Sequence, residues 1–382
     1  MCILRVTAAR GSGLLLVAGS VAAVAAAATD PGSAAKAASQ DWPPFVLVVG
    51  LLLLGLVAAE DRLFAAAGER LAGAATNGWL LFAGVCVLIV VTTAVLNLDT
   101  SVAFLAPVLV HTARRRGQDA AVLLSACLLL SNAGSLLLPG SNLTNLIVLG
   151  HLHLSGGSFA LRMGLPWVAA STVTALVVAA FGRRVLGRLV EPDGESVRPV
   201  AGLGLAAVVA AAVLVVVLKS PALPVVAVGA GSAGWRVVRG RQQVAAVFET
   251  LGLPLLLGLL GLAVGLGTLG RDWSGPARLM AHLDPWATAG VAAVATVVVN
   301  NLPAASLLAS RTPAHPYSLL IGLNLGPNLF ATGSLSWVLW LRSARAAGGT
   351  PSVKRTAAIG LVAVPISIAV ALLALSATSG LT

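Results

Sequence analysis

The sequence predicts an all-α polytopic membrane protein with two inverted repeats, each holding one re-entrant helical hairpin and one broken transmembrane helix. Three observations support this: the composition, the polar strings inside long apolar runs, and the recurrence of one pattern in both halves. Of the 382 residues, 58% are hydrophobic and 10% are charged. A soluble domain carries about 25% charged residues, so the composition excludes a soluble enzyme. The apolar runs are too long and too uniform for the alternating strands of a membrane β-barrel.

Several function classes are excluded by composition and motifs. The formal net charge is +11, but the basic residues lie between apolar runs, whereas a nucleic-acid-binding protein gathers them on one face. The patterns G-x-x-x-x-G-K-[ST], H-E-x-x-H and C-x-x-C are absent. We therefore expect no ATP hydrolysis by this chain, no metal site and no cofactor. We expect the chain to lie in a lipid bilayer and to have no nucleic-acid partner.

The expected organisation has five parts, taken in chain order. They are residues 1–43, an N-terminal span or signal-like segment and an outer loop; 44–181, the first repeat, with a hairpin at 74–113 and a broken helix at 120–150; 182–243, a cytoplasmic linker and two connecting spans; 244–342, the second repeat, with a hairpin at 285–313 and a broken helix at 316–342; and 343–382, a cytoplasmic loop and the last span.

The hairpins are predicted from polar strings inside two apolar runs and from the positions of the basic residues. Asn97–Ser101 and Asn300–Pro303 would each interrupt a simple span. If both units are re-entrant, the outer side holds only six basic residues, and every other Lys and Arg lies on the cytoplasmic side. The six are Lys36, Arg162, Lys219, Arg271, Arg278 and Arg311. This split obeys the positive-inside rule and places an uncleaved N-terminus in the cytoplasm.

The second half repeats the first. Asn97 aligns with Asn300, the string 131–135 aligns with 323–327, and the string 140–143 aligns with 333–335 after a one-residue slip. Under the charge assignment, the two copies have opposite orientations. Inverted repeats of this kind typically hold a solute near the midplane, at discontinuous helices.

Four polar clusters inside the apolar runs supply the candidate site. Gly and Pro free backbone groups that hydrocarbon cannot satisfy, and Asn side chains add donors and acceptors. The candidate substrate-binding residues are Asn97, Thr100, Asn132, Ser141, Asn142, Asn145, Asn300, Asn301, Asn324 and Ser334. The candidate helix-break residues are Gly134, Pro139, Gly140, Pro303, Gly326, Pro327 and Gly333. The alternative is that single Asn, Ser and Thr side chains only join helices by hydrogen bonds.

Asp99 is the most distinctive single residue. It is a carboxylate at the tip of a predicted hairpin, and carboxylates inside a membrane usually mark ion or proton paths. We expect Asp99 to bind and release the coupling proton. The alternative is a tip carboxylate that merely accepts hydrogen bonds from loop amides.

Four strings resemble the arsenite-efflux permeases (arsenical pump membrane proteins) of the ion transporter superfamily. They are AVLNLDTSVAFLAPVLV, SNAGSLLLPGSNLTNLIVLG, NNLPAASLL and GLNLGPNLFATGSLSWVLWLR. The superfamily also holds divalent-anion/sodium symporters and sodium/proton antiporters. The chain departs from the permease pattern at Phe330-Ala331-Thr332, where the family typically has Thr-Pro and one further residue.

The resemblance implies an inverted-repeat ion-transporter fold in the plasma membrane and proton-coupled efflux of arsenite or antimonite. The implied partners are a small inorganic solute and a coupling ion, either a proton or sodium, with an ATPase subunit and a second copy of the chain as further candidates. A site of amides and hydroxyls suits an uncharged trihydroxide such as arsenite. Two alternatives stay open: an ion-coupled transporter of an inorganic or organic anion (dicarboxylate or citrate-like), or a sodium/proton antiporter. An intramembrane enzyme or a scaffold is the remote alternative.

Overall fold

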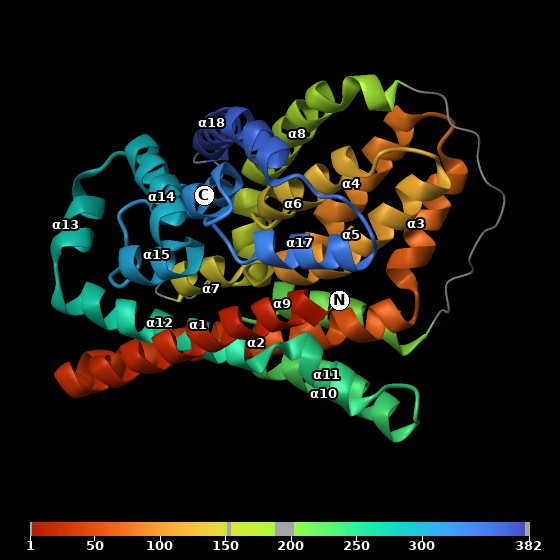
Figure 1. Cartoon of the computed structure of the whole chain (residues 1–382). Helices are drawn as coiled ribbons and strands as arrows, with labels where there is room; N and C mark the ends of the chain where they lie inside the picture. Colours follow the sequence, from red (N-terminus) through yellow and green to blue (C-terminus); the bar gives the residue numbers. More distant parts are fainter. Residues whose placement is uncertain (1, 151–153, 188–201, 379–382) are drawn as a thin grey trace.

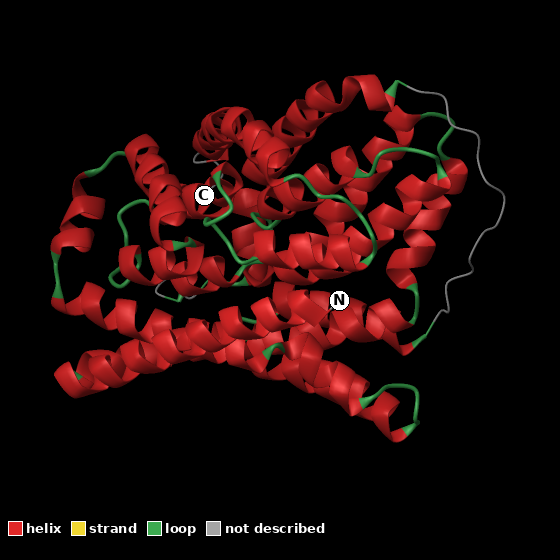
Figure 2. Ribbon diagram, in the orientation of Figure 1, coloured by secondary structure: helices red, strands yellow, loops and turns green. Residues whose placement is uncertain are grey.

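The computed structural model describes residues 2–150, 154–187 and 202–378, and within these ranges the ordered elements are helices without a strand (Figure 2). Five stretches of described helix are long and apolar enough to cross a membrane. They are α2 (Pro31–Glu60), α4 (Gly78–Val95), α8 (Gly156–Leu186), α11 with α12 (Val244–Leu251 and Leu253–Asp272) and α18 (Val353–Ala377). The predicted all-α, multi-pass membrane protein is thereby confirmed.

The chain begins with α1 (Cys2–Thr29), and the segment after it differs from expectation. Residues 30–43 were expected to form an outer loop, but α2 starts at Pro31. Asp30 explains this start, because its side chain accepts a hydrogen bond from Ser33 N at 2.9 Å and Pro31 occupies the first helical position. The helix of the span therefore extends through the polar segment.

The helices on either side of the middle of the chain follow the same order. The first set is α2, α3 (Leu63–Ala74), α4, α5 (Leu98–Arg115), α6 (Ala121–Gly134), η1 (Pro139–Ser141), α7 (Leu143–Leu149) and α8. The second set is α11–α12, α13 (Gly275–His282), α14 (Pro285–Val299), α15 (Asn301–Leu308), α16 (Pro316–Leu325), η2 (Gly326–Leu329), α17 (Ser336–Ala346) and α18. Between them lie α9 (Leu203–Val217) and α10 (Ala222–Val238).

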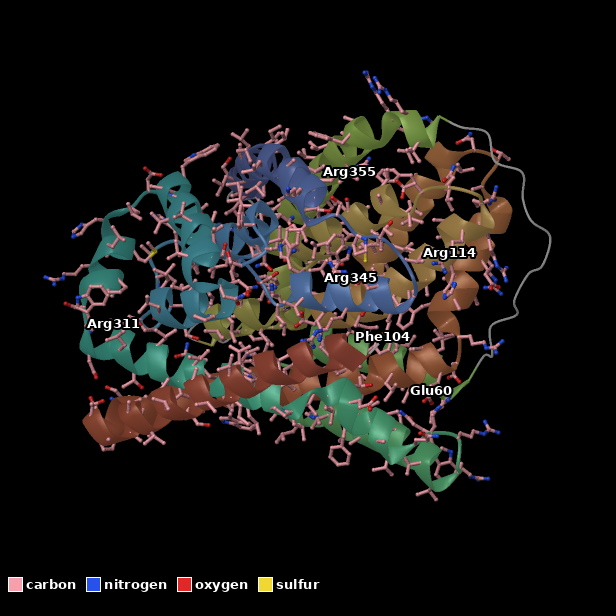
Figure 3. The ribbon with its side chains drawn as sticks, in the orientation of Figure 1. Glu60, Phe104, Arg114, Arg311, Arg345 and Arg355 are labelled. Atoms are coloured by element: carbon pink, nitrogen blue, oxygen red, sulfur yellow. The ribbon has the colours of Figure 1, made fainter. Side chains whose placement is uncertain are left out.

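The two sets are oriented oppositely along the long axis of the molecule. Figure 1 shows α3 at one end and α13 at the other. Helix α3 precedes the hairpin helices α4 and α5, and α13 precedes the hairpin helices α14 and α15. Arg116, at the end of α5, donates to Ala75 O, just before α4, at 2.9 Å, so the open ends of α4 and α5 lie together. Arg311 lies at the end opposite to Glu60 and Arg114 (Figure 3). Re-entry of the hairpins from opposite membrane faces stays a prediction.

Contacts between the two sets place the broken helices at the centre. Helix α7 packs against α15 of the other set, and α17 packs against α5. The outer pair α8 and α18 also packs together, with a 3.0 Å hydrogen bond between Thr174 and Ser367. Each broken helix therefore lies between a helix of its own hairpin and a helix of the other.

Small residues allow the long helices α1, α2, α10 and α12 to pack closely. A Cβ added at Gly50 of α2 would come within 2.7 Å of Val226 Cα in α10, and one at Gly19 of α1 within 2.0 Å of Gly258 O in α12. Such contacts let membrane helices gain dispersion energy that larger side chains would prevent. Of these helices, α2 packs against α7 of the first broken helix, and α12 packs against α15 of the second hairpin.

Candidate functional site

The first broken helix is interrupted between Gly134 and Asn142. Helix α6 ends at Gly134, and α7 starts after Asn142, whose Oδ1 accepts from Thr144 N at 3.2 Å. Gly134 allows close approach to α4, since an added Cβ would lie 3.2 Å from Val90 Cα. The carbonyl of Gly134 is no longer bonded within the helix and accepts from Trp167 Nε1 at 3.1 Å.

The second broken helix is interrupted in the same way. Helix α16 ends at Leu325, and Gly326 and Pro327 open η2. An added Cβ at Gly326 would lie 2.5 Å from Ala293 Cα in α14. The Pro327 carbonyl accepts from Trp337 Nε1 at 2.8 Å. In both halves, a glycine lies against the first hairpin helix and an indole satisfies a freed carbonyl.

The two tips are capped by the predicted asparagines. Asn97 Oδ1 accepts from Thr100 N at 2.6 Å at the start of α5, and Asn300 Oδ1 accepts from Leu302 N at 3.4 Å at the start of α15. Asn300 has a φ of 75°, a region that non-glycine residues rarely adopt. Pro303 lies in the first turn of α15 rather than at the break, where a proline costs no hydrogen bond.

A hydroxyl from each broken helix contacts the hairpin tip of its own half. Ser141 Oγ donates to Ala94 O at 2.9 Å, and Thr332 Oγ1 donates to Val297 O at 2.7 Å. Ala94 and Val297 each lie three positions before the tip asparagine. We name residues 93–100 with 135–144 the first tip–loop site, and residues 297–302 with 330–334 the second tip–loop site.

Asparagines join the two broken helices to each other. Asn324 Oδ1 accepts from Ser135 Oγ at 2.6 Å and from Asn142 Nδ2 at 2.8 Å, while its Nδ2 donates to Asn145 Oδ1 at 2.7 Å. Asn132 Nδ2 donates to Asn328 Oδ1 at 2.8 Å. The structure thus brings Asn132, Asn142, Asn145 and Asn324 together in one buried network.

The remaining candidates lie at the tips or in the second loop. The methyl group of Thr100 is turned toward α2, where a Cβ added at Gly55 would come within 2.2 Å of it. Asp99 lies in the first turn of α5, and the structure describes no hydrogen bond or ion pair for its carboxylate. Asn301 donates through its backbone N–H to Gly333 O at 2.8 Å. Ser334 Oγ is paired with Ser336 Oγ at 2.5 Å.

Three contributors were not among the predicted residues: Ser135, Asn328 and Thr332. Ser135 follows the break at Gly134, and Asn328 follows Gly326-Pro327, so both lie in the polar strings that the sequence displays. Their position within two residues after a helix-breaking glycine is the signal that could have identified them. Thr332 lies in the three-residue departure from the permease pattern.

The first tip–loop site holds polar atoms that lack a hydrogen-bond partner among the described residues. They are Thr93 Oγ1, Asn97 Nδ2, Thr100 Oγ1 and Thr144 Oγ1, with Asn132 Oδ1 close behind in the network. Buried polar groups are normally paired, so unpaired ones call for a ligand, an ion or water. The buried basic side chains of the described residues, Arg116 and Arg236, lie elsewhere: Arg116 bonds Ala75 O and Arg236 pairs with Asp61.

The site also presents helix ends of both polarities. Helices α5 and α7 begin here, and α4 and α6 end here. N-terminal ends favour negative charge and C-terminal ends favour positive charge. The first tip–loop site can therefore hold an anion and a cation side by side without a basic side chain, an arrangement that discontinuous membrane helices provide.

The chain resembles known transporters over most of its length. The fold resembles that of the YdaH transporter of Alcanivorax borkumensis, whose crystal structure matches with a TM-score of 0.53 and 15% sequence identity over 92% of this chain and 88% of that chain. No curated protein sequence matches. The profile of the family described as "Citrate transporter" matches residues 2–340. The chain is therefore a membrane transporter rather than an enzyme, and it belongs to the citrate transporter family.

Proposed function

We propose that this protein is an ion-coupled secondary transporter of a multivalent carboxylate, with citrate as the first candidate. The observation that carries the proposal is the first tip–loop site, where helices α5 and α7 both begin and where buried donors lack a partner. Helix N-termini bind carboxylate and phosphate groups through backbone N–H groups and the helix dipole. A carboxylate can be held here without an arginine. The citrate transporter family match supports the same class of solute.

The coupling ion in this proposal is a proton, with sodium as the alternative, and it binds at Asp99. Three features support this position: the carboxylate lies in the first turn of α5, it has no described partner, and it adjoins the Asn97 cap. If a proton couples, Asp99→Asn abolishes citrate accumulation driven by a pH gradient but leaves citrate exchange without a gradient. Unchanged accumulation in this variant would show that the coupling ion binds elsewhere.

Purified protein in liposomes provides the test of the substrate class. We expect labelled citrate to accumulate when an inward proton or sodium gradient is imposed, and an ionophore to abolish the accumulation. An unlabelled tricarboxylate should compete with labelled citrate for uptake, whereas a monocarboxylate should compete only weakly. Uptake equal to that of protein-free liposomes, under either gradient, would exclude citrate transport.

Proton-coupled efflux of arsenite or antimonite is the second candidate. One observation favours it: the network around Asn324 consists of amides and a hydroxyl, which suit an uncharged polyhydroxylated solute. Expression in a metalloid-sensitive host without its own efflux system should then lower arsenite accumulation, and Asn301→Ala should abolish the effect. Co-expression of an efflux ATPase subunit would show whether such a partner adds to the effect. Unchanged accumulation would exclude this candidate while leaving the citrate proposal intact.

The proposed setting is the plasma membrane, with the N-terminus in the cytoplasm and Arg311 outside. Arg311 and Arg114 lie at opposite ends of the molecule (Figure 3), which supports a membrane normal along that axis. Labelling of single cysteines at positions 311 and 114 from outside intact cells would test the orientation, since only position 311 should react. The same preparation, cross-linked in the membrane, would show whether the protein is a homodimer.

A further inference from the structure

A cavity of about 720 Å³ opens between the start of α2, the end of α7 and the connection from α9 to α10. This volume lies within the range of small-molecule sites, about 300–1,000 Å³. The cavity lies near the end of the molecule where Arg311 is found, because its wall includes Arg271 and Arg311 Nη2 donates to Arg271 O at 2.8 Å. In the proposed orientation this is the outer end.

The wall of the cavity is basic. It includes Lys36 from α2, Lys219 from the α9–α10 connection and Arg271 from α12, and none of its described lining residues is acidic. Arg271 already lies near Asp41 and Asp272 and bonds Gly267 O at 2.8 Å. Asp41 is buried and is not part of the wall. The uncompensated positive charge of the cavity is therefore that of the two exposed lysines.

The cavity ends next to the first tip–loop site. Pro139 of η1 lines it, and the next residue, Gly140, is packed between Leu47 and Val215. A Cβ added at Gly140 would lie 3.3 Å from Val215 Cγ1 and 3.4 Å from Leu47 Cδ2. Ser141, which follows, is buried and bonds Ala94 O. Two apolar side chains and the backbone at Gly140, which is the edge of the first tip–loop site, thus separate the cavity from Ser141 and the unpaired polar atoms of the site.

We propose that this cavity is an outer vestibule that binds a multivalent carboxylate through Lys36 and Lys219 before the solute passes Gly140 to the first tip–loop site. The inference rests on the proposed function and deepens it, because it selects the charged solute over the neutral one. A cleft of one charge sign raises the local concentration of the opposite charge. An uncharged trihydroxide gains nothing from the two lysines, whereas a tricarboxylate carries negative charge that both attract.

The test compares Lys36→Gln/Lys219→Gln with a matched control, Lys354→Gln, which removes an exposed lysine far along the chain at the start of α18. In liposomes, the double variant should raise the KM for citrate roughly tenfold with kcat unchanged, and the KM should lose its dependence on salt concentration. The control should behave as the unmodified protein. If citrate is transported with an unchanged KM in the double variant, the vestibule is excluded and the proposed function stands.

A binding measurement separates the vestibule from transport. Trp42 lines the cavity and is 44% exposed, so citrate should change its fluorescence, isolated as the difference between the unmodified protein and Trp42→Phe. In nanodiscs of neutral lipid, a response that the double variant lacks supports the vestibule even if transport fails. No response to citrate in neutral lipid would overturn the proposal. A change in Trp42 fluorescence that anionic lipid produces and citrate does not would overturn it too, and would assign the cavity to lipid headgroups.

Discussion

The two tip–loop sites are built on one plan but differ in burial and in hydrogen bonding. In the first, Asn97 is 2% and Asn142 5% exposed, and a single side-chain hydrogen bond, from Ser141 to Ala94 O, joins tip and loop. In the second, Phe330 is 55% exposed. Three hydrogen bonds join tip and loop there: Asn300 Nδ2 to Thr332 O, Asn301 N to Gly333 O, and Thr332 Oγ1 to Val297 O.

The difference assigns separate roles to the halves. The first site has unused hydrogen-bonding capacity in Asn97 Nδ2 and the hydroxyls of Thr93, Thr100 and Thr144, so a solute can satisfy it. The second site has its tip and loop bonded to each other, so a solute would have to break contacts there. We therefore expect binding mainly in the first half and a fastening role in the second.

The largest expected effect is on stability and distinguishes the aligned residues Asn324 and Asn132. Asn324→Ala removes the partner of Asn142 Nδ2 and of Asn145 Oδ1 and leaves Ser135 Oγ bonded only to Asn132 O, whereas Asn132→Ala frees mainly Asn328 Oδ1. Each orphaned buried group costs about 1–3 kcal/mol, so we expect a loss of about 3–5 kcal/mol for Asn324→Ala and about 1–2 kcal/mol for Asn132→Ala. Thermal unfolding in detergent would measure both. Equal losses would mean that the network is shared evenly between the broken helices.

The second prediction concerns transport and compares two helix caps. Asn77 caps α4 by accepting from Leu80 N at 2.9 Å, as Asn97 caps α5, but Asn77 lies outside the site. Either change to Ala should cost about 1 kcal/mol of stability. Only Asn97→Ala should also reduce the initial rate of citrate uptake, by about 100-fold, or about 2.7 kcal/mol. If both variants lost uptake equally, loss of a cap would suffice to explain the defect.

A third prediction concerns access to the two sites. Thr332→Cys lies in an exposed loop and Asn97→Cys at a buried tip. A water-soluble maleimide should modify the cysteine at position 332 about tenfold faster, since thiol reactivity depends on exposure. Of the three native cysteines, Cys86 and Cys127 are buried and should contribute little, and Cys2 is replaced by Ser in both variants. Equal rates at both positions would contradict the difference in burial.

Local sequence could predict the breaks but not the partners across them. Asn97 and Asn300 precede helices that they cap, and Gly134 and Gly326 end helices, so residue type and neighbours suffice. The bonds of Asn324 to Asn142 and Asn145 join residues some 180 positions apart and depend on how the repeats dock. No local pattern contains that information.

The lack of tertiary information in local sequence also applies to two features outside the network. The polar composition of residues 30–43 indicated a loop, yet the Asp30 cap and contacts between α2 and α12 keep this segment helical. Thr100 was predicted as a solute ligand, and the packing of its methyl group toward Gly55 of α2 leaves its hydroxyl unpaired in the first tip–loop site. In both cases tertiary packing decides what the residue does.

The smallest expected effect tests the backbone of the two tips. Asn300 has a φ of 75°, whereas Asn97 is extended with a φ of −176°. Glycine replaces an asparagine cap better than alanine at either tip, but only at position 300 does alanine also meet a positive-φ region that is nearly restricted to glycine (φ 75°, ψ 152°), at a cost of about 1 kcal/mol. The stability gap between Asn300→Gly and Asn300→Ala should therefore exceed the gap between Asn97→Gly and Asn97→Ala by about 1 kcal/mol. Thermal unfolding of the four variants measures this double difference, in which the loss of each side chain cancels. A double difference near zero would mean that the second tip can relax its backbone freely, and its hydrogen bonds to the loop could not then fix its geometry.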